Sequence, residues 1–316
     1  MSALTPLQQR TQDALGSAVA DRRVWDPQTG EALKDRLVRE VGSSAVDDLY
    51  VSKARLTSVL GCEVRHLAEE EAGFRWTVPT ARGAIAHKAV ELLVFARPGA
   101  TAVEMVDEVM AAAIDDRRVL GQSLTDFLQA LGELDGARLR SESTRLAAAF
   151  LDVFPPLKTA WAPVAEPAYR VELLDGRLVL SGRPDLVLGR PDGFTAKRVV
   201  IDWKSGSVRQ EHLDDLRFYA VLVTMRQGIP PLRVGTVYLE SGTVEARAVD
   251  EDLLEAGLRR TIAGTRRLVE LGAGAEPALR PGPACAWCPV SDCEAGRAWL
   301  RARDAGDEAG FGADWE

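Results

Sequence analysis

The hydrophobic pattern of the chain changes its period about halfway along. In the first half, apolar residues recur every three or four positions, which is typical of amphipathic helices. Glycine and proline residues interrupt this pattern and separate the segments. We therefore expect an N-terminal helical region at residues 1–80 and an all-helical insertion at about residues 98–160. The individual helices are predicted at residues 52–73, 82–96, 101–120, 124–131 and 137–154.

In the second half, apolar and polar residues alternate, which predicts strands. Residues 169–173 and 177–182 flank Asp175-Gly176, a dipeptide typical of hairpin turns. Further strands are predicted at residues 185–189, 198–204, 234–239 and 243–249, and helices at residues 211–227 and 250–271. The predicted fold class is α/β, a mixed β-sheet core flanked by helices, with the helical N-terminal region and the helical insertion.

These elements divide the chain into four parts. The N-terminal region, residues 1–80, carries Cys62 and precedes a core of residues 81–272, which contains the insertion. A C-terminal segment at residues 273–303 carries the other three cysteines. Residues 304–316 are expected to form a flexible acidic tail.

The composition fits an ordinary globular protein. The chain has 316 residues, a formal net charge of −8 and 46% hydrophobic residues, which suits one large domain with an insertion. No run of 18 apolar residues occurs, and the first 25 residues contain no apolar signal segment. We therefore expect a cytoplasmic protein with no membrane partner. The acidity argues against wrapping duplex DNA over a wide surface, although it does not exclude a local basic groove.

Three charged side chains stand at strand positions where a plain core would have apolar ones. Asp202 and Lys204 are two residues apart in an apolar strand and so share one face, while Asp185 begins the preceding strand. Two carboxylates can hold Mg²⁺, which prefers oxygen ligands, and an adjacent ammonium can orient the attacking water. A buried salt bridge is the alternative interpretation of the same three residues.

The usage of lysine supports a specific role for Lys204. The chain has 39 basic residues, yet only six are lysine, and it contains no asparagine. An arginine could not easily replace Lys204, because a compact ammonium fits beside a metal-bound water and a planar guanidinium does not. The six lysines are Lys34, Lys53, Lys88, Lys158, Lys197 and Lys204.

Two helical positions extend this candidate site. His87 lies in a Gly-x-x-x-His sequence with Glu91 one turn later, and a core histidine is the alternative. Asp215 and Tyr219 are four residues apart on the helix after Lys204 and so share a face.

The four cysteines form a spacing that predicts a metal or cluster site. Cys285, Cys288 and Cys293 form a tight knuckle that needs a fourth ligand, and Cys62 is the one remaining cysteine. A structural zinc site usually has two paired knuckles, whereas thiolates from distant segments can hold a [4Fe–4S] cluster. We therefore favour iron–sulfur over zinc, and four unrelated buried thiols are the remaining alternative.

The order of these motifs resembles the RecB-type nucleases of the PD-(D/E)XK superfamily. The matching sequences are G-x-x-x-H at His87, G-R-P-D at Asp185, I-D-W-K-S-G at Asp202 and D-x-x-x-Y at Tyr219. The resemblance implies a restriction-endonuclease-like fold. It makes His87, Asp185, Asp202 and the Trp203 carbonyl the metal ligands, Lys204 the catalytic lysine and Tyr219 a residue that approaches the scissile strand. Asp215 departs from the pattern, because the family usually has glutamine at this DNA-contacting position.

The cysteines resemble one subgroup of the same family. The iron–sulfur nucleases, which include AddB nuclease domains and CRISPR-adaptation exonucleases, have one cysteine before the core and three after it. The resemblance implies a Mg²⁺- or Mn²⁺-dependent deoxyribonuclease with a structural [4Fe–4S] cluster, acting as an exonuclease on single-stranded DNA ends. Repair, CRISPR adaptation and phage processing are all open as pathways.

Two further expectations concern partners. Arg259 and Arg266 lie seven residues apart on one predicted helix and could follow a phosphate backbone, with a solvated face as the alternative. No G-x-x-x-x-G-K-[ST] phosphate loop occurs, so any unwinding requires a separate helicase. The rival function is a catalytically inactive DNA-binding or scaffold subunit of a helicase–nuclease repair complex.

Overall fold

The computed structural model describes residues 3–16, 22–42, 46–97, 99–115, 121–190 and 192–311. The last residues of the helix predicted at 101–120 and the end of the predicted acidic tail lie outside these ranges. None of the described helices is long and apolar enough to cross a membrane.

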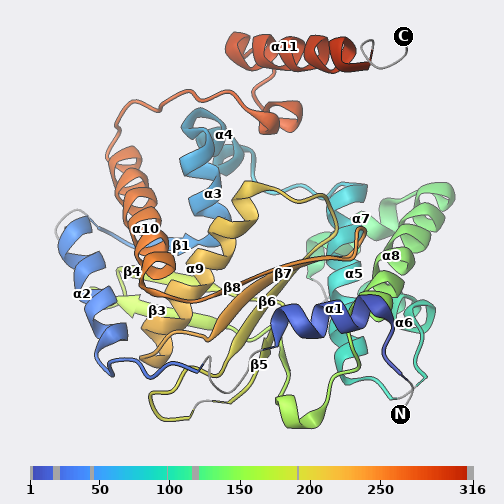
Figure 1. Cartoon of the computed structure of the whole chain (residues 1–316). Coiled ribbons are helices and arrows are strands. Elements are labelled where there is room, and N and C mark those ends of the chain that lie inside the picture. The colour runs from blue at the N-terminus through green and yellow to red at the C-terminus, as the bar shows by residue number, and fades with distance from the viewer. Residues whose placement is uncertain are drawn as a thin grey trace.

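Two β-sheets form the centre of the fold (Figure 1). In the larger sheet, of order β2-β5-β6-β7-β8, only the central pair β6 and β7 is parallel. The smaller sheet, of order β1-β4-β3, joins the predicted hairpin β3–β4 to β1, which runs parallel to β4. The strands are β1 (Leu49–Ser52), β2 (Val164–Ala165), β3 (Tyr169–Leu173), β4 (Leu178–Gly182), β5 (Leu186–Leu188), β6 (Val199–Lys204), β7 (Arg233–Tyr238) and β8 (Thr243–Ala248).

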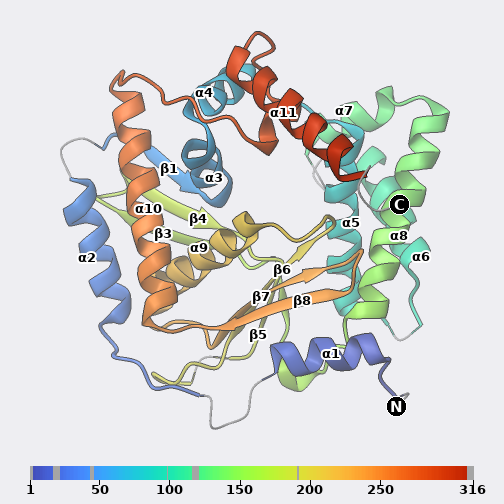
Figure 2. The same ribbon diagram turned by 45° about the horizontal axis from the view of Figure 1, so that its top comes forward.

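Helices cover both faces of the larger sheet. Helix α9 makes the crossover between β6 and β7 and lies at the centre of the molecule (Figure 1). Helix α10 packs against both α9 and α2, and helices α5 to α8 lie together at the opposite end of the molecule (Figures 1 and 2). The helices are α1 (Pro6–Leu15), α2 (Thr29–Val41), α3 (Lys53–Gly61), α4 (Glu63–Ala72), α5 (Val78–Phe95), α6 (Ala102–Asp115), α7 (Gln122–Ala130), α8 (Glu133–Val153), α9 (Gln210–Gln227), α10 (Glu251–Gly272) and α11 (Glu294–Phe311), with 3-10 turns η3 (Thr159–Trp161) and η4 (Pro283–Trp287).

The alternation of side chains along β6 separates two hydrophobic cores. Val199, Ile201 and Trp203 point into a core shared with α5, α6 and α8. Val200 points to the opposite face, into a core shared with α2, α9 and α10. Because successive residues of a strand face opposite sides, Asp202 and Lys204 share the α9 face with Val200.

The predicted fold class is confirmed. The structure is a mixed α/β fold consistent with the restriction-endonuclease-like architecture, and the β3–β4 hairpin turns at Asp175-Gly176 with positive φ angles at both residues. The four-part division of the chain stays a prediction.

Three local predictions differ from the structure. Strand β1 was not expected, because its four residues pair with β4, far along the chain, and carry no alternating signal of their own. The helix predicted at residues 52–73 is interrupted at Cys62, whose extended backbone (φ −148°, ψ 116°) separates α3 from α4. The C-terminal helix α11 continues to Phe311 and so includes part of the predicted tail.

A buried carboxylate ties α4 to the chain that follows α10. The Glu63 side chain is 2% exposed and accepts hydrogen bonds from Arg267 Nη2 (2.7 Å) and from the Ala278 N–H (2.6 Å). The Glu63 N–H in turn donates to the Ala278 carbonyl (3.2 Å). The bond from Arg267 holds the pKa of Glu63 below its usual range.

We expect Glu63→Gln to lower the free energy of unfolding by about 3 kcal/mol, because removing one partner leaves the other charge poorly compensated. Glu270→Gln is the matched control, since Glu270 pairs with the same Arg267 (2.8 Å) but is 56% exposed, and it should cost less than about 1 kcal/mol. Denaturant unfolding of both variants measures this difference.

The pH dependence of the Glu63 effect has a defined sign. A lowered carboxyl pKa contributes stability above the ordinary glutamate pKa, and this contribution is lost as the pH falls through the lower value of the folded state. The gap in stability between wild type and Glu63→Gln should therefore narrow on acidification. Equal costs for the two variants at neutral pH would contradict the structural role of Glu63.

Candidate active site

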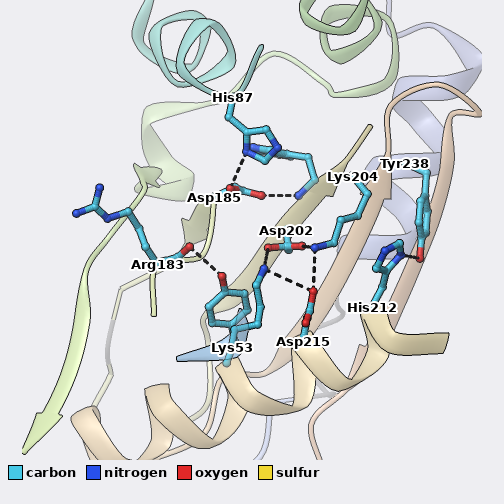
Figure 3. A network of polar contacts seen from close by, with 11 residues as sticks. Lys53, His87, Arg183, Asp185, Asp202, Lys204, His212, Asp215 and Tyr238 are labelled. Atoms are coloured by element: carbon cyan, nitrogen blue, oxygen red, sulfur yellow. Dashed lines mark hydrogen bonds and ion pairs between the residues drawn. The ribbon is translucent and has the colours of Figure 1, made fainter. Parts of the chain in front are cut away.

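The end of β6 presents the predicted charged pair toward α9 (Figure 3). Asp202 is 2% exposed, and the Trp203 ring on the opposite face packs edge-on against Phe150 and Phe154. This aromatic packing holds one face of β6, so Asp202 and Lys204 lie on the other face. The register of β6 with β7 sets their positions along the sheet.

Asp185 lies where the chain passes from the small sheet to the large one, directly before β5. Its Oδ2 accepts a hydrogen bond from the Trp203 N–H (2.6 Å), and its Oδ1 lies 3.1 Å from His87 Nδ1 (Figure 3). The N–H and C=O of one extended residue point to the same edge of a strand. The Trp203 carbonyl therefore faces the edge on which Asp185 lies.

His87 reaches this edge from the buried helix α5. Burial lowers the pKa of His87, but the attraction of Asp185 and the hydrogen bond between them outweigh burial and leave the pKa raised. The structure thus brings together His87, Asp185 and the edge of β6, as the sequence predicts.

Two ammonium groups surround Asp202 (Figure 3). Lys204 Nζ lies 2.7 Å from Asp202 Oδ2 and 2.9 Å from Asp215 Oδ2. Lys53 Nζ lies 3.1 Å from Asp202 Oδ1 and 3.5 Å from Asp215 Oδ2. Burial alone would raise the pKa of Asp202, but the charges of the two lysines outweigh burial and leave this pKa lowered. Asp202 is therefore a carboxylate at every physiological pH.

The sequence analysis did not assign Lys53 to the site. One signal was present, because Lys53 is one of the six lysines of an arginine-rich chain. Lys53 lies near Asp202 because strand β1, which the sequence did not predict, pairs with β4 and places the start of α3 beside β4.

The chemistry of the donors suits a divalent cation. Asp202 Oδ2 is buried and, despite its ion pair with Lys204, has no partner in hydrogen-bond geometry among the described residues. Carboxylate oxygens are the ligands that a hard cation prefers, so the buried carboxylates of Asp185 and Asp202 fit such an ion. As placed in the described chain, however, no three His, Cys, Asp or Glu side chains form a group that could hold a metal ion. The ligand assignments therefore stay predictions.

A family model matches residues 50–293, which include all of these side chains. The chain belongs to the PD-(D/E)XK nuclease superfamily. A search of curated proteins finds no match. Solved structures similar to this nuclease include the "Putative exonuclease" of Eubacterium rectale, with a TM-score of 0.41 and 12% identity over 79% of this chain and 87% of that one. Another is SSO0001, with a TM-score of 0.37 and 16% identity over 84% of this chain and 96% of that one.

Tyr219 of this nuclease supports the loop that carries Asp185. Its buried hydroxyl donates to the Arg183 carbonyl (2.9 Å), two residues before Asp185. A side chain at Gly182 would collide with α9, because its Cβ would lie 2.9 Å from Leu222 and 3.1 Å from the Tyr219 ring. The Tyr219 hydroxyl therefore points at the backbone of this loop. A contact between Tyr219 and the scissile DNA strand stays a prediction.

Glu166 adjoins the same loop from β2. Its N–H donates to the Asp185 carbonyl (2.9 Å), and its carboxylate lies 3.6 Å from Arg183. Burial raises the pKa of Glu166, and the neighbouring carboxylates of Glu91 and Asp185 raise it further.

The predicted DNA-binding residues fall into two groups. Asp215 lies inside the cluster and pairs with both lysines. Arg259 and Arg266 lie on α10, where Arg259 is 3.6 Å from Glu255 and Arg266 donates to the Glu40 carbonyl of α2 (2.5 Å). In the described part of the chain these arginines contact the helical layer and make no ion pair with Asp185, Asp202 or Asp215, so their contact with DNA stays a prediction.

The four cysteines line one cavity of about 560 Å³, and this cavity also reaches Lys204 and Asp215. All four thiols are free. Backbone N–H groups of Gly282 and Gly296 donate to the sulfurs of Cys285 and Cys293 (both 3.3 Å). A Cβ at Gly296 would lie 3.4 Å from each of these two sulfurs, so glycine keeps the space beside them open.

The wall of this cavity nearest Lys204 adds residues that the sequence analysis missed. His212 Nδ1 lies 3.0 Å from the Tyr238 hydroxyl, and burial lowers the pKa of His212. The Arg209 guanidinium lies 5.9 Å from the centre of the Trp287 ring, which is 57% exposed. A basic wall with an exposed aromatic ring thus extends from Lys204 to the cysteine segment.

Proposed function

We propose that this nuclease is a metal-dependent deoxyribonuclease that degrades single-stranded DNA from an end and carries a structural [4Fe–4S] cluster. The observation that carries the catalytic part is the buried grouping of Asp185, Asp202 and Lys204 at the end of β6, where Lys204 Nζ lies 2.7 Å from Asp202 Oδ2.

The metal site would be made by Asp185, Asp202, His87 and the Trp203 carbonyl. Bound Mg²⁺ or Mn²⁺ would polarise the phosphodiester and lower the pKa of its water. Lys204 points its ammonium at Asp202 and Asp215, from where it can hold the attacking water and balance charge on the phosphate. Asp185 keeps the strand edge in place through the Trp203 N–H and orients His87.

The cysteine cavity supports the iron–sulfur part of the proposal. Four free thiols from both ends of the matched region line one cavity, although as placed no three described cysteines form a metal-holding group, and N–H groups donate to two of the sulfurs. Such hydrogen bonds stabilise thiolates and tune clusters. Zinc held by the same four cysteines is the less favoured alternative.

The basic wall of the cavity supports a single-stranded substrate. Single strands bind to grooves in which cationic side chains follow the backbone and aromatic rings stack on unpaired bases. Arg209 and the exposed Trp287 offer one of each beside Lys204. A separate helicase, and a pathway such as repair, belong to this proposal as expectations.

A cleavage assay with differently labelled substrates tests the function. We expect Mn²⁺ or Mg²⁺ to support degradation of a linear single-stranded oligonucleotide to short products, and EDTA to stop it. A circular single strand should resist, because an exonuclease needs an end. Labels at the 5′ and 3′ ends report polarity, and duplex DNA and RNA of the same sequence report substrate class.

Each result has one consequence. Rapid cleavage of the circle would replace the exonuclease with an endonuclease. Tight binding of the linear strand without cleavage under any divalent metal would favour the inactive DNA-binding or scaffold subunit.

A further inference from the structure

Lys53 enters the carboxylate cluster from a different part of the chain than the other charged groups. It is the first residue of α3 and follows β1 directly, with the Ser52 hydroxyl capping the helix at the Arg55 N–H (3.2 Å). Helix α3 packs closely on α10, because a Cβ at Gly264 would lie 2.4 Å from Leu56. The two segments that flank Lys53 are thus held independently, β1 by its pairing with β4 and α3 by its packing on α10.

The side chain of Lys53 is aimed at the carboxylates (Figure 3). Its ammonium contacts Asp202 and Asp215 and lies 5.0 Å from the centre of the Tyr219 ring. Burial lowers the pKa of Lys53, but the surrounding carboxylates outweigh burial and leave the pKa raised. A lysine is positively charged at neutral pH, and the contacts with Asp202 and Asp215 place this charge inside the cluster.

Lys53 is not needed to give either carboxylate a partner. Lys204 already reaches both Asp202 (2.7 Å) and Asp215 (2.9 Å), at shorter distances than Lys53 does. What Lys53 adds is a second positive charge beside a group of three aspartates. A role in charge balance therefore explains its position better than a role in pairing.

We propose that Lys53 is a positioning residue that sets the charge of the metal-binding carboxylates, so that the metal-loaded site attracts a phosphodiester. This inference rests on the proposed metal-dependent function. A histidine that coordinates a metal is neutral, so in the loaded site Asp185, Asp202 and Asp215 outnumber Lys53 and Lys204 by one negative charge. A divalent ion leaves the site with one positive charge, opposite to the phosphodiester, whereas without Lys53 the loaded site would be neutral.

The charge argument predicts opposite effects on metal and on substrate. Lys53→Met keeps an apolar stem of similar length but removes a positive charge that repels the cation. We expect it to bind Mn²⁺ roughly tenfold more tightly while cleaving single-stranded DNA at least about tenfold more slowly. Calorimetric titration with Mn²⁺ alone gives the affinity, and an end-labelled oligonucleotide gives the rate.

Two further variants isolate charge from shape. Lys53→Arg keeps the charge and should keep the Mn²⁺ affinity of the wild type. In the double variant Lys53→Met with Asp215→Asn, one positive and one negative charge are removed together, and the Mn²⁺ affinity should return toward that of the wild type. Lys34→Met is the matched control, because Lys34 pairs with Glu31 on α2, outside the cluster, and should change neither quantity.

The outcomes separate this inference from the proposed function. If the wild type binds Mn²⁺ but Lys53→Met binds it no more tightly, or only loses thermal stability, Lys53 merely supports the fold and the inference is wrong. If the wild type neither binds Mn²⁺ nor cleaves DNA, the proposed function is wrong, and the inference about Lys53 is wrong as well. Tighter Mn²⁺ binding with slower cleavage, reversed in the double variant, supports the inference.

Discussion

Replacing Asp202 with asparagine should lower the rate of DNA cleavage about a thousandfold while leaving the fold intact. The amide has the shape of the carboxylate and can still accept a hydrogen bond from Lys53, so the two lysines keep a polar neighbour. It lacks the negative charge that a divalent cation requires from this ligand. The loss should therefore appear in the rate and in Mn²⁺ affinity, with little change in the circular dichroism spectrum.

Asp214→Asn is the matched control for this variant. Asp214 precedes Asp215 on α9, but its carboxylate pairs with Arg217 (2.9 Å) and Arg260 (3.4 Å). The same chemical change one position away from the cluster should leave the cleavage rate within about twofold of the wild-type rate. Within the described chain the Asp214 side chain makes no ion pair with a cluster residue, and exposed ion pairs contribute little to the stability of the fold. If Asp202→Asn cleaved within tenfold of the wild type, Asp202 would not be a metal ligand and the buried salt bridge would explain the cluster.

The central part of the site could be predicted from the sequence because its geometry is local. Asp202 and Lys204 share a face since a strand has a period of two, and their apolar neighbours define the strand. Asp185 follows the β3–β4 hairpin, whose turn is visible as Asp175-Gly176, and β5 then pairs with β6. Short-range periodicity and turn chemistry therefore place Asp202 and Lys204 on β6 and Asp185 directly before the neighbouring strand β5.

The remaining part of the site depends on contacts that no local pattern encodes. Lys53 joins the cluster only because β1 pairs in parallel with β4, a pairing between segments far apart in the chain. The break at Cys62 is similarly hidden, because residues on both sides continue a helical pattern. Arg259 and Arg266 have a regular spacing on α10 that indicates a basic face, and the structure places them beside Glu255 and the Glu40 carbonyl, so their contact with DNA stays a prediction.

The break at Cys62 has a direct consequence for the proposed cluster. The extended backbone at Cys62 ends α3 and separates it from the next helix. The Cys62 side chain at this break lies on the wall of the cysteine cavity. The same helix α3 begins at Lys53, in the carboxylate cluster. A nine-residue helix therefore connects the two proposed sites.

Cys62→Ala should accordingly remove most of the bound iron and lower the melting temperature by roughly 10 °C or more, since losing a ligand opens the link between the two ends of the chain. Iron analysis and absorbance near ~400 nm of anaerobically purified protein measure the cluster, and calorimetry measures the melting temperature. Ser58→Ala is the control on the same helix. It removes a hydroxyl that donates to Glu69 (2.9 Å) but no proposed ligand, so it should keep the full iron content.

The metal content of the wild type decides between the two forms of this prediction. Stoichiometric zinc with almost no iron would replace the cluster with a zinc site, and Cys62→Ala should then lose zinc instead. If the variant kept the metal content and melting temperature of the wild type, Cys62 would be an ordinary half-buried thiol. Cleavage by Cys62→Ala should fall together with its folded fraction, because α3 carries Lys53 into the proposed catalytic cluster. A variant that lost iron yet kept its fold and its rate would show that the cysteine segment is not required to hold α3 in place.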